Sequence, residues 1–263
     1  MSSTAFDSII EQIVSDSPSG EILEVYNDLL AIAGESAKES ILDAIEQYNV
    51  KNTVAVDVDG NSVLLSKYNK EGTKFYDPAN GISFSVDHLN RKGLDVEPYS
   101  VKLTEEQQSL LESLQKYAST NFSGDVTLAV YPIADSNKVV IILISTRNNP
   151  SNFYNGNWKS EYIYDIDSTE LTGTIDVHVH YYEDGNVSFR SNKEVEIIKT
   201  KDVVKTIQEI EKDFEDRLDV SFSELNEKKF KTLRRRLPIT RSKVNWGKAI
   251  GTYRLGKDAA QGN

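Results

Sequence analysis

One apolar stripe late in the chain constrains the fold more than any other feature. Seven large apolar side chains recur there at intervals of three and four residues, which places them on one face of an α-helix. They are Val203, Ile207, Ile210, Phe214, Leu218, Phe222 and Leu225. The stripe predicts a single helix that is longer than the usual three or four turns, so we expect it to cross a whole sheet or to reach a partner. Pro238 should end it.

The segment that follows the stripe is strongly basic. Eleven of the 30 lysines and arginines, and none of the 41 acidic residues, lie between residues 228 and 257, so the rest of the chain has a formal charge of −22. A block of like charge repels itself and is stabilised when an anionic partner neutralises it. The pattern therefore predicts an interaction surface, and the alternative is a solvated tail without a partner.

The same segment has an apolar side. Trp246, Ile250 and Tyr253 are spaced to share one helical face. A short basic amphipathic helix docks into a groove on another protein, lies on an anionic membrane, or packs on its own chain. Gly247 and Gly251 each cost about 1 kcal/mol in a helix interior, so we expect this helix to fray without a partner.

Composition excludes several kinds of protein. The chain has no cysteine, so disulfides, thiolate metal ligands and a cysteine nucleophile are ruled out. Its longest apolar run, from Val139 to Ile144, is far shorter than a membrane span. The first residues contain acidic side chains and no basic cluster before an apolar run, unlike a targeting peptide. These features predict a cytoplasmic protein.

Hydrophobic periodicity predicts an α+β fold with an N-terminal helical bundle, a small β region, an antiparallel sheet crossed by a long helix, and a basic amphipathic C-terminal tail. The expected divisions are residues 1–50 for the helical bundle, 51–124 for the small irregular β region and a helix, 125–200 for the antiparallel sheet, 201–237 for the long helix and 238–263 for the tail.

Local signals place several elements. Asp59-Gly60 predicts a tight hairpin, and Thr104 with Gln107 predicts a capping box. Ser17-Pro18 should begin the second helix, and Gly34 should end it. The first two helices should have the apolar positions Phe6, Ile9, Ile10 and Ile13, then Ile22, Val25, Leu29 and Ile32. The run Val139–Ile144 should lie in mid-sheet with both faces covered.

The catalytic and metal signals are weak. Asp176, His178 and His180 alternate along a predicted strand and would share one face, so two imidazoles and a carboxylate could ligate a metal. The preferred interpretation is a polar sheet face packed under the long helix. Phosphate-binding glycine loops, a nucleophile elbow and a zinc-protease motif are missing from the sequence. We therefore expect no enzyme, no metal and no cofactor.

Four segments carry a family resemblance: Ala44–Asn49 (AIEQYN), Asn152–Ser160 (NFYNGNWKS), His180–Val187 (HYYEDGNV) and Leu233–Trp246 (LRRRLPITRSKVNW). In this order they resemble the F-actin-capping protein alpha subunit, and the N-terminal sequence resembles the fungal members. The family commonly has Trp at position 154, Arg at 157 and 159, and Gln at 236, where this chain has Tyr154, Asn157, Lys159 and Arg236.

The resemblance implies an obligate heterodimer with a beta subunit of similar fold, the two sharing an antiparallel sheet. It implies calcium-independent binding to the barbed ends of actin filaments, which blocks subunit exchange without severing, in the cytoplasm at the cytoskeleton and cortical actin patches. By position in the family, the residues expected to contact actin are Lys231, Arg234, Arg235, Arg241, Lys243, Trp246, Ile250 and Tyr253. Phosphoinositides would inhibit at Lys231, Arg235 and Arg241.

Two other classes of function stay open on the sequence. A peripheral protein that binds phosphoinositides or anionic membranes through the tail would bind vesicles without a beta subunit. A nucleic-acid-binding protein would use the eleven basic residues against phosphates. The strongly acidic remainder of the chain and the lack of a nucleic-acid motif argue against the second class.

Overall fold

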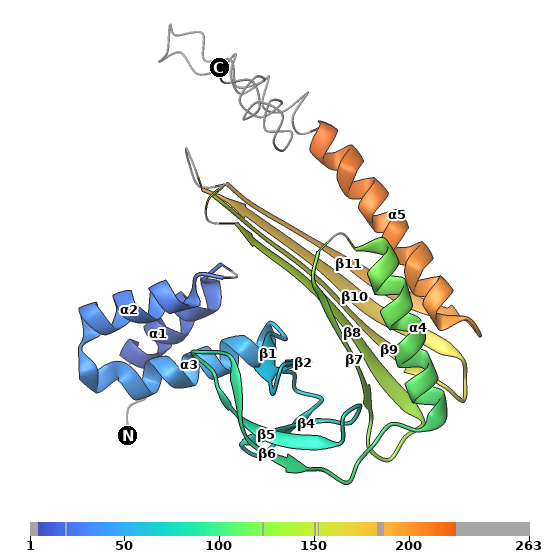
Figure 1. Cartoon of the computed structure of the whole chain (residues 1–263). Helices are drawn as coiled ribbons and strands as arrows, with labels where there is room; N and C mark the ends of the chain where they lie inside the picture. Colours follow the sequence, from blue (N-terminus) through green and yellow to red (C-terminus); the bar gives the residue numbers. More distant parts are fainter. Residues whose placement is uncertain are drawn as a thin grey trace, which may run out of the picture. The chain divides into compact units, whose positions relative to one another are not determined.

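The computed structural model describes residues 5–18, 20–122, 124–149, 151, 153–182 and 187–224 (Figure 1). The chain divides into two compact units, residues 1–208 and residues 209–263. The first unit contains four helices and two sheets, and helix α5 begins at its end. The described part of the second unit is the remainder of α5. The expected mixed α+β fold is confirmed.

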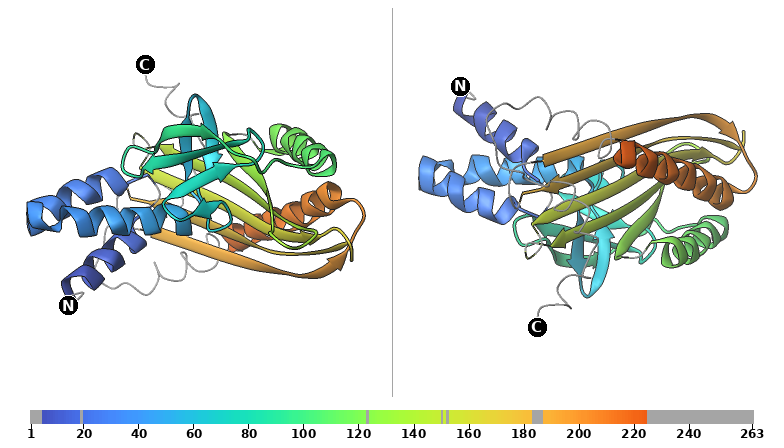
Figure 2. Two further views of the ribbon diagram at one scale, coloured as in Figure 1. Left: turned by 90° about the horizontal axis from the view of Figure 1, so that it is seen from below. Right: turned by 90° about the horizontal axis from the view of Figure 1, so that it is seen from above.

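The chain begins with three helices grouped together (Figure 2). They are α1 (Ala5–Asp16), α2 (Ile22–Ala33) and α3 (Lys38–Lys51), with a 3₁₀ turn, η1 (Glu35–Ala37), before α3. Their shared core includes Ile10, Val14 and Ile45. Gly34 ends α2 as predicted: its φ of 81° suits glycine, and its N–H donates to the Leu30 carbonyl at 2.9 Å.

The predicted start of the second helix is wrong. Helix α2 begins at Ile22, with Glu21 at the N-cap position. The Ser17 hydroxyl instead donates to the Ile13 carbonyl at 2.8 Å, so it satisfies the end of α1, whose last carbonyls have no partner within the helix.

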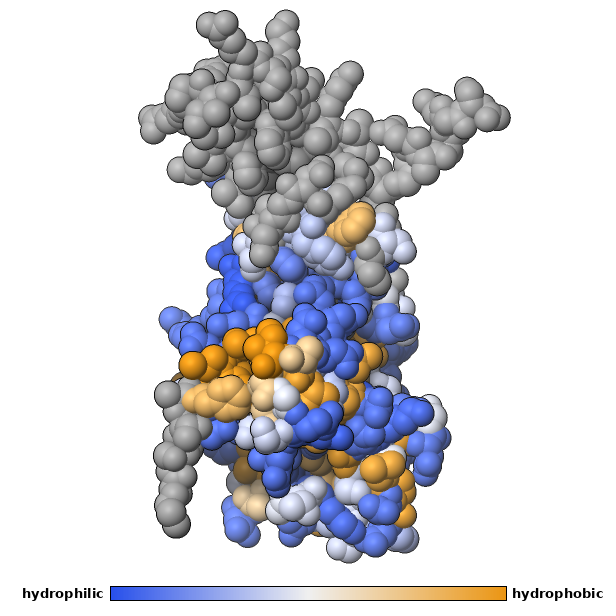
Figure 3. All heavy atoms as spheres, turned by 90° about the vertical axis from the view of Figure 1, so that its left-hand side faces the viewer, coloured by the Kyte–Doolittle hydropathy of each residue, from blue (hydrophilic) through white to orange (hydrophobic). Residues whose placement is uncertain are grey.

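The predicted apolar stripes on α1 and α2 are only partly buried. Ile10 and Val14 of α1 are buried in the core that the three helices share, whereas Phe6, Ile9 and Ile13 are each at least 44% exposed. Ile32 on α2 is 84% exposed. Figure 3 shows hydrophobic side chains gathered on the face that these helices present. The apolar residues of α1 therefore lie on two sides of the helix, and the described residues leave one of these sides exposed.

A small sheet follows, in the order β2-β1-β6-β5-β4-β3. Its strands are β1 (Ala55–Val58), β2 (Asn61–Leu64), β3 (Lys70–Glu71), β4 (Lys74–Asp77), β5 (Ile82–Asp87) and β6 (Lys92–Pro98). The predicted hairpin is confirmed, because Val58 pairs with Asn61 and both turn residues, Asp59 and Gly60, have positive φ. The core of the sheet contains Phe75 and Phe84, whose rings lie 6.4 Å apart.

Helix α4 (Glu105–Asn121) links the two sheets and packs beside β7 (Val126–Pro132). The predicted capping box is confirmed: Thr104 Oγ1 accepts from the Gln107 N–H, and Gln107 Oε1 accepts from the Thr104 N–H. Beyond the helix, the Phe122 ring lies edge-on to Tyr117 and to Trp158. These aromatic contacts join the end of α4 to the larger sheet.

The larger sheet has the order β11-β10-β9-β8-β7, with every neighbouring pair antiparallel. Its other strands are β8 (Lys138–Asn149), β9 (Tyr154–Asp165), β10 (Glu170–Tyr181) and β11 (Val187–Lys199). The six residues from Val139 to Ile144 are buried on both faces, as predicted. On one face Val140, Ile142 and Ile144 pack with Leu64 of the small sheet.

Helix α5 (Val203–Glu224) confirms the predicted long helix as far as Glu224. The first five positions of its apolar stripe are each less than a tenth exposed: Val203, Ile207, Ile210, Phe214 and Leu218. The expected continuation of the helix to Leu237 lies outside the residues that the structure describes, as does Pro238.

Candidate functional site

The residues expected to bind actin and phosphoinositides lie outside the residues that the structure describes. They are Lys231, Arg234, Arg235, Arg241, Lys243, Trp246, Ile250 and Tyr253. The structure does describe the helix that leads to them. Within Val203–Glu224 there are seven acidic and three basic residues, so the charge reverses sharply between α5 and the basic segment.

The structure places the Asp176, His178 and His180 row on one face of β10, as alternation predicts. Its partners come from neighbouring elements. Asp176 Oδ1 accepts from Asn192 Nδ2 at 2.5 Å, His178 Nε2 lies 3.0 Å from Ser188 Oγ, and His180 Nδ1 lies 3.5 Å from Glu21 Oε1. Among the described residues, no group of three or more His, Cys, Asp or Glu side chains is arranged to hold a metal ion.

These contacts correct the expected surroundings of the row. We expected it to pack under the long helix, but His180 is buried beside Glu21 at the start of α2. Lys159, on β9 and on the same sheet face as Asp176, donates to the Lys51 carbonyl at the end of α3. This polar face of the sheet therefore contacts the N-terminal helices.

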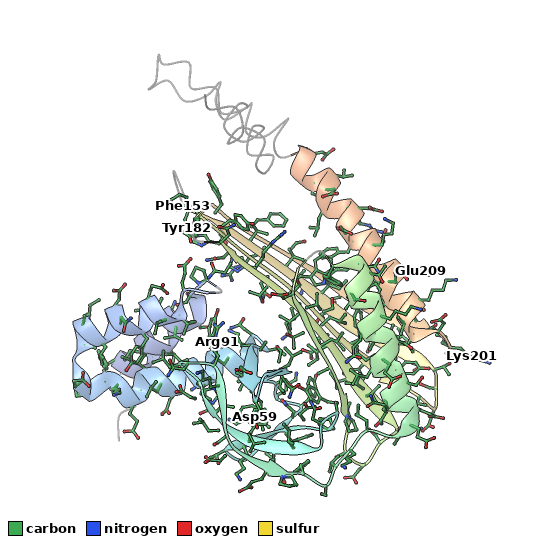
Figure 4. The ribbon with its side chains drawn as sticks, in the orientation of Figure 1. Asp59, Arg91, Phe153, Tyr182, Lys201 and Glu209 are labelled. Carbon is green, nitrogen blue, oxygen red and sulfur yellow. The ribbon has the colours of Figure 1, made fainter. Side chains whose placement is uncertain are left out.

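Burial lowers the pKa of His178, and electrostatic interactions with Arg190 and His180 lower it further. Burial also lowers the pKa of Arg91, a residue that Figure 4 labels on the connection between the small-sheet strands β5 and β6. Arg91 and Arg190 both act electrostatically on Tyr48, so basic side chains from both sheets lie near α3.

Two segments of the family resemblance meet in the structure. Asn155 of the 152–160 segment pairs with His180 of the 180–187 segment across β9 and β10. Nearby, the Phe153 and Tyr182 rings lie 5.9 Å apart at the end of the sheet (Figure 4). The Ala44–Asn49 segment lies on α3, where Tyr48 donates to the Ser17 carbonyl and Asn49 to the His88 carbonyl. Residues of these three segments therefore form buried contacts between elements that are distant in the sequence.

A cavity of about 420 Å³ lies between the end of α3, residues 66–70 and β9. Its charged lining is Glu46, Lys51, Lys67, Lys70, Lys159 and Glu161, and its other lining residues are Gln47, Val50, Thr53, Ser66 and Tyr68. No sequence motif indicates this cavity, because its lysines come from three separate stretches of the chain.

Comparison with known proteins identifies the family. The protein family described as "F-actin capping protein alpha subunit" matches residues 10–258 of this chain. The chain belongs to the F-actin capping protein alpha subunit family. The match covers both sheets, α5 and all of the basic segment from residue 228 to 257.

Relatives in this family align along almost their whole length. An F-actin-capping protein subunit alpha from Candida glabrata is 60% identical over 260 residues, covering 99% of each chain. One from Saccharomyces cerevisiae is 56% identical, covering 100% of each chain. A solved structure titled "homodimeric actin capping protein alpha subunit from Plasmodium berghei" superposes with a TM-score of 0.75, covering 90% of this chain and 99% of that one. At 23% identity, this structure supports the fold alone.

Proposed function

We propose that this chain is the alpha subunit of a heterodimeric capping protein that binds the barbed ends of actin filaments and blocks subunit exchange there. The observation that carries the proposal is the family match through residue 258, which includes every residue expected to contact actin. The relatives bear the name F-actin-capping protein subunit alpha and match the chain from end to end. A binding protein, and not an enzyme, fits this family.

In the proposed mechanism, the basic and the apolar residues of the tail have different roles. Lys231, Arg234, Arg235, Arg241 and Lys243 would steer the protein toward an acidic filament end, so that association is fast and sensitive to salt. Trp246, Ile250 and Tyr253 would bury apolar surface on actin, so that dissociation is slow. Capping of this kind requires neither calcium nor cleavage of the filament.

The partner in this proposal is a beta subunit of similar fold. Two features of the chain support a partner. Helix α1 leaves Phe6, Ile9 and Ile13 exposed, and β11 is the last strand of its sheet, with one edge that pairs with no other strand among the described residues. Exposed apolar rows and free strand edges are surfaces that partner chains cover. We also propose that α5 crosses the shared sheet.

Phosphoinositides are the proposed inhibitors, because their phosphates would compete with actin for Lys231, Arg235 and Arg241. The competing proposal, a peripheral protein acting on anionic membranes, uses the same residues. No helix among the described residues is long and apolar enough to cross a membrane. We propose that the heterodimer works in the cytoplasm, at cytoskeletal sites such as cortical actin patches.

Seeded elongation of actin filaments tests the proposal. The full chain is co-expressed with a beta subunit and added to filament seeds, beside a chain truncated after Leu237. We expect growth to stop at barbed ends with the full chain and to resume largely with the truncated one. Normal elongation in the presence of a folded dimer would contradict capping. Binding of the chain to anionic vesicles without a beta subunit would then favour the membrane proposal.

A further inference from the structure

The cavity beside α3 has an excess of positive charge. Four lysines and two glutamates line it, so its formal charge is +2 in a chain whose net charge is −11. Its volume of about 420 Å³ is within the range of small-molecule sites, roughly 300 to 1,000 Å³. The lysines come from α3, from the 66–70 segment and from β9, so the fold itself gathers them.

Both carboxylates in the cavity already have partners. Glu161 Oε1 accepts from the Tyr68 hydroxyl at 2.7 Å, and its Oε2 lies 3.5 Å from Lys159 Nζ. Glu46 Oε1 lies 2.7 Å from Lys70 Nζ, and its Oε2 lies 3.9 Å from His88 Nε2. Because hydrogen-bond donors or positively charged lysines already face each carboxylate, the two glutamates are poor ligands for an added cation.

The lysines retain donors for an anion. Each ammonium group has three N–H donors. Lys51 Nζ lies 3.0 Å from the neutral Ser15 hydroxyl. The Lys67 side chain is 69% exposed, with its Nζ 3.9 Å from Glu161 and 4.8 Å from the centre of the Tyr68 ring. Neither amine is held by a close carboxylate, so both are available to an incoming anion.

The carboxyl end of α3 does not repel an anion strongly here, because its last carbonyls are all capped. Asn52 donates to the Tyr48 carbonyl, Val54 to that of Asn49, and Thr53 to that of Val50. Lys159 Nζ donates to the Lys51 carbonyl at 3.2 Å. These bonds satisfy the groups that carry the partial negative charge of a helix end.

We propose that this cavity binds a phosphate monoester group. A phosphate monoester has up to two negative charges and three acceptor oxygens, which match the excess charge and the lysine donors. Lysine binds phosphate as a point charge, and Thr53 and Gln47 add neutral polar groups to the wall. The site is separate in sequence from the basic tail, so it does not depend on the proposed capping function.

Calorimetric titration of the full chain in complex with a beta subunit tests the site, with glycerol 3-phosphate as the free probe. The test variant is Lys51→Gln with Lys67→Gln, which removes the two amines that no close carboxylate holds. Its matched control is Lys74→Gln with Lys92→Gln, which removes the same charge from the neighbouring small sheet. The control also breaks an ion pair, because Lys74 Nζ lies 2.6 Å from Glu97; the test variant removes the longer contact of Lys67 Nζ with Glu161, at 3.9 Å.

We expect the test variant to bind glycerol 3-phosphate at least about tenfold more weakly, because charged hydrogen bonds are lost, while the control keeps the wild-type affinity. An additional variant, Arg235→Gln with Arg241→Gln, should also keep it, which separates this site from the tail. Phosphatidylcholine vesicles containing phosphatidic acid then compare a lipid source with the free one. Two results would overturn the proposal. The wild-type dimer would fail to bind glycerol 3-phosphate, or the test and control variants would lose affinity for it equally.

Discussion

Nδ2 of Asn155 on β9 lies 2.6 Å from Oε1 of Glu21, the residue that precedes α2. The two residues are far apart in the sequence, and Asn155 is only 3% exposed. The same carboxylate oxygen lies 3.5 Å from Nδ1 of the buried His180. One glutamate therefore ties the N-terminal helices to two strands of the large sheet.

Glu21→Ala should destabilise the protein by about 1–3 kcal/mol, because a buried amide donor loses its acceptor. Chemical unfolding of the heterodimer measures the loss. Glu24→Ala, an exposed position one helical turn along α2, is the matched control and should change stability little. If both variants unfold at the same denaturant concentration, the contact contributes nothing measurable.

Gly173→Ala should also destabilise the protein, by about 1–3 kcal/mol, because an added methyl group has no room. A Cβ at Gly173 would overlap the Glu161 carbonyl and the Tyr162 ring on β9. Thermal unfolding of the heterodimer measures the effect. Gly156→Ala on β9 is the control, since the nearest atom to its added Cβ is the Arg147 carbonyl oxygen at 3.9 Å. Equal melting temperatures for the two variants would contradict the steric argument.

Stability should fall as the pH drops below the ordinary histidine pKa of 6.5. Burial lowers the pKa of His88 and also that of His178. The unfolded chain then binds more protons than the folded one, so the stability that is complete above the unfolded pKa is lost on acidification. Unfolding free energies measured at about pH 7.5 and pH 5.5 report the loss.

The matched variant for the pH effect is His88→Gln with His178→Gln. It lacks both imidazoles, so its stability should depend less on pH over this interval than that of the wild type. An identical pH dependence in the wild type and the variant would show that other groups cause the effect.

The proposed division of labour in the tail predicts different kinetic changes. Arg235→Glu with Arg241→Glu should lower the association rate with barbed ends by about tenfold or more, because steering is electrostatic. Trp246→Ala should mainly raise the dissociation rate, by about tenfold or more. Single-filament elongation measures both rates. Lys92→Glu with Lys102→Glu removes equal charge outside the tail and is the control. Similar changes in both rates for both tail variants would contradict the division.

Short-range signals predicted most of the elements. The capping box at Thr104, the hairpin at Asp59-Gly60 and the end of α2 at Gly34 depend on backbone groups within a few residues, so the local sequence contains the necessary information. The stripe on α5 is equally local as far as Leu218. The prediction for Ser17 was wrong because its hydroxyl can either accept from the N-terminus of α2 or donate to the C-terminus of α1. The local sequence does not distinguish these two roles, and the structure shows the second.

The sequence by itself determined the α+β fold, the order of its elements and the resemblance to a family. Only the tertiary structure decided that Ile10 and Val14 are buried while Ile9 and Ile13 are exposed. It also decided that His180 lies beside Glu21 at the start of α2. Likewise, only the tertiary structure brings four lysines to one cavity, namely Lys51, Lys67, Lys70 and Lys159. Periodicity defines which residues share a face. What that face meets depends on how distant elements pack, which no local pattern specifies.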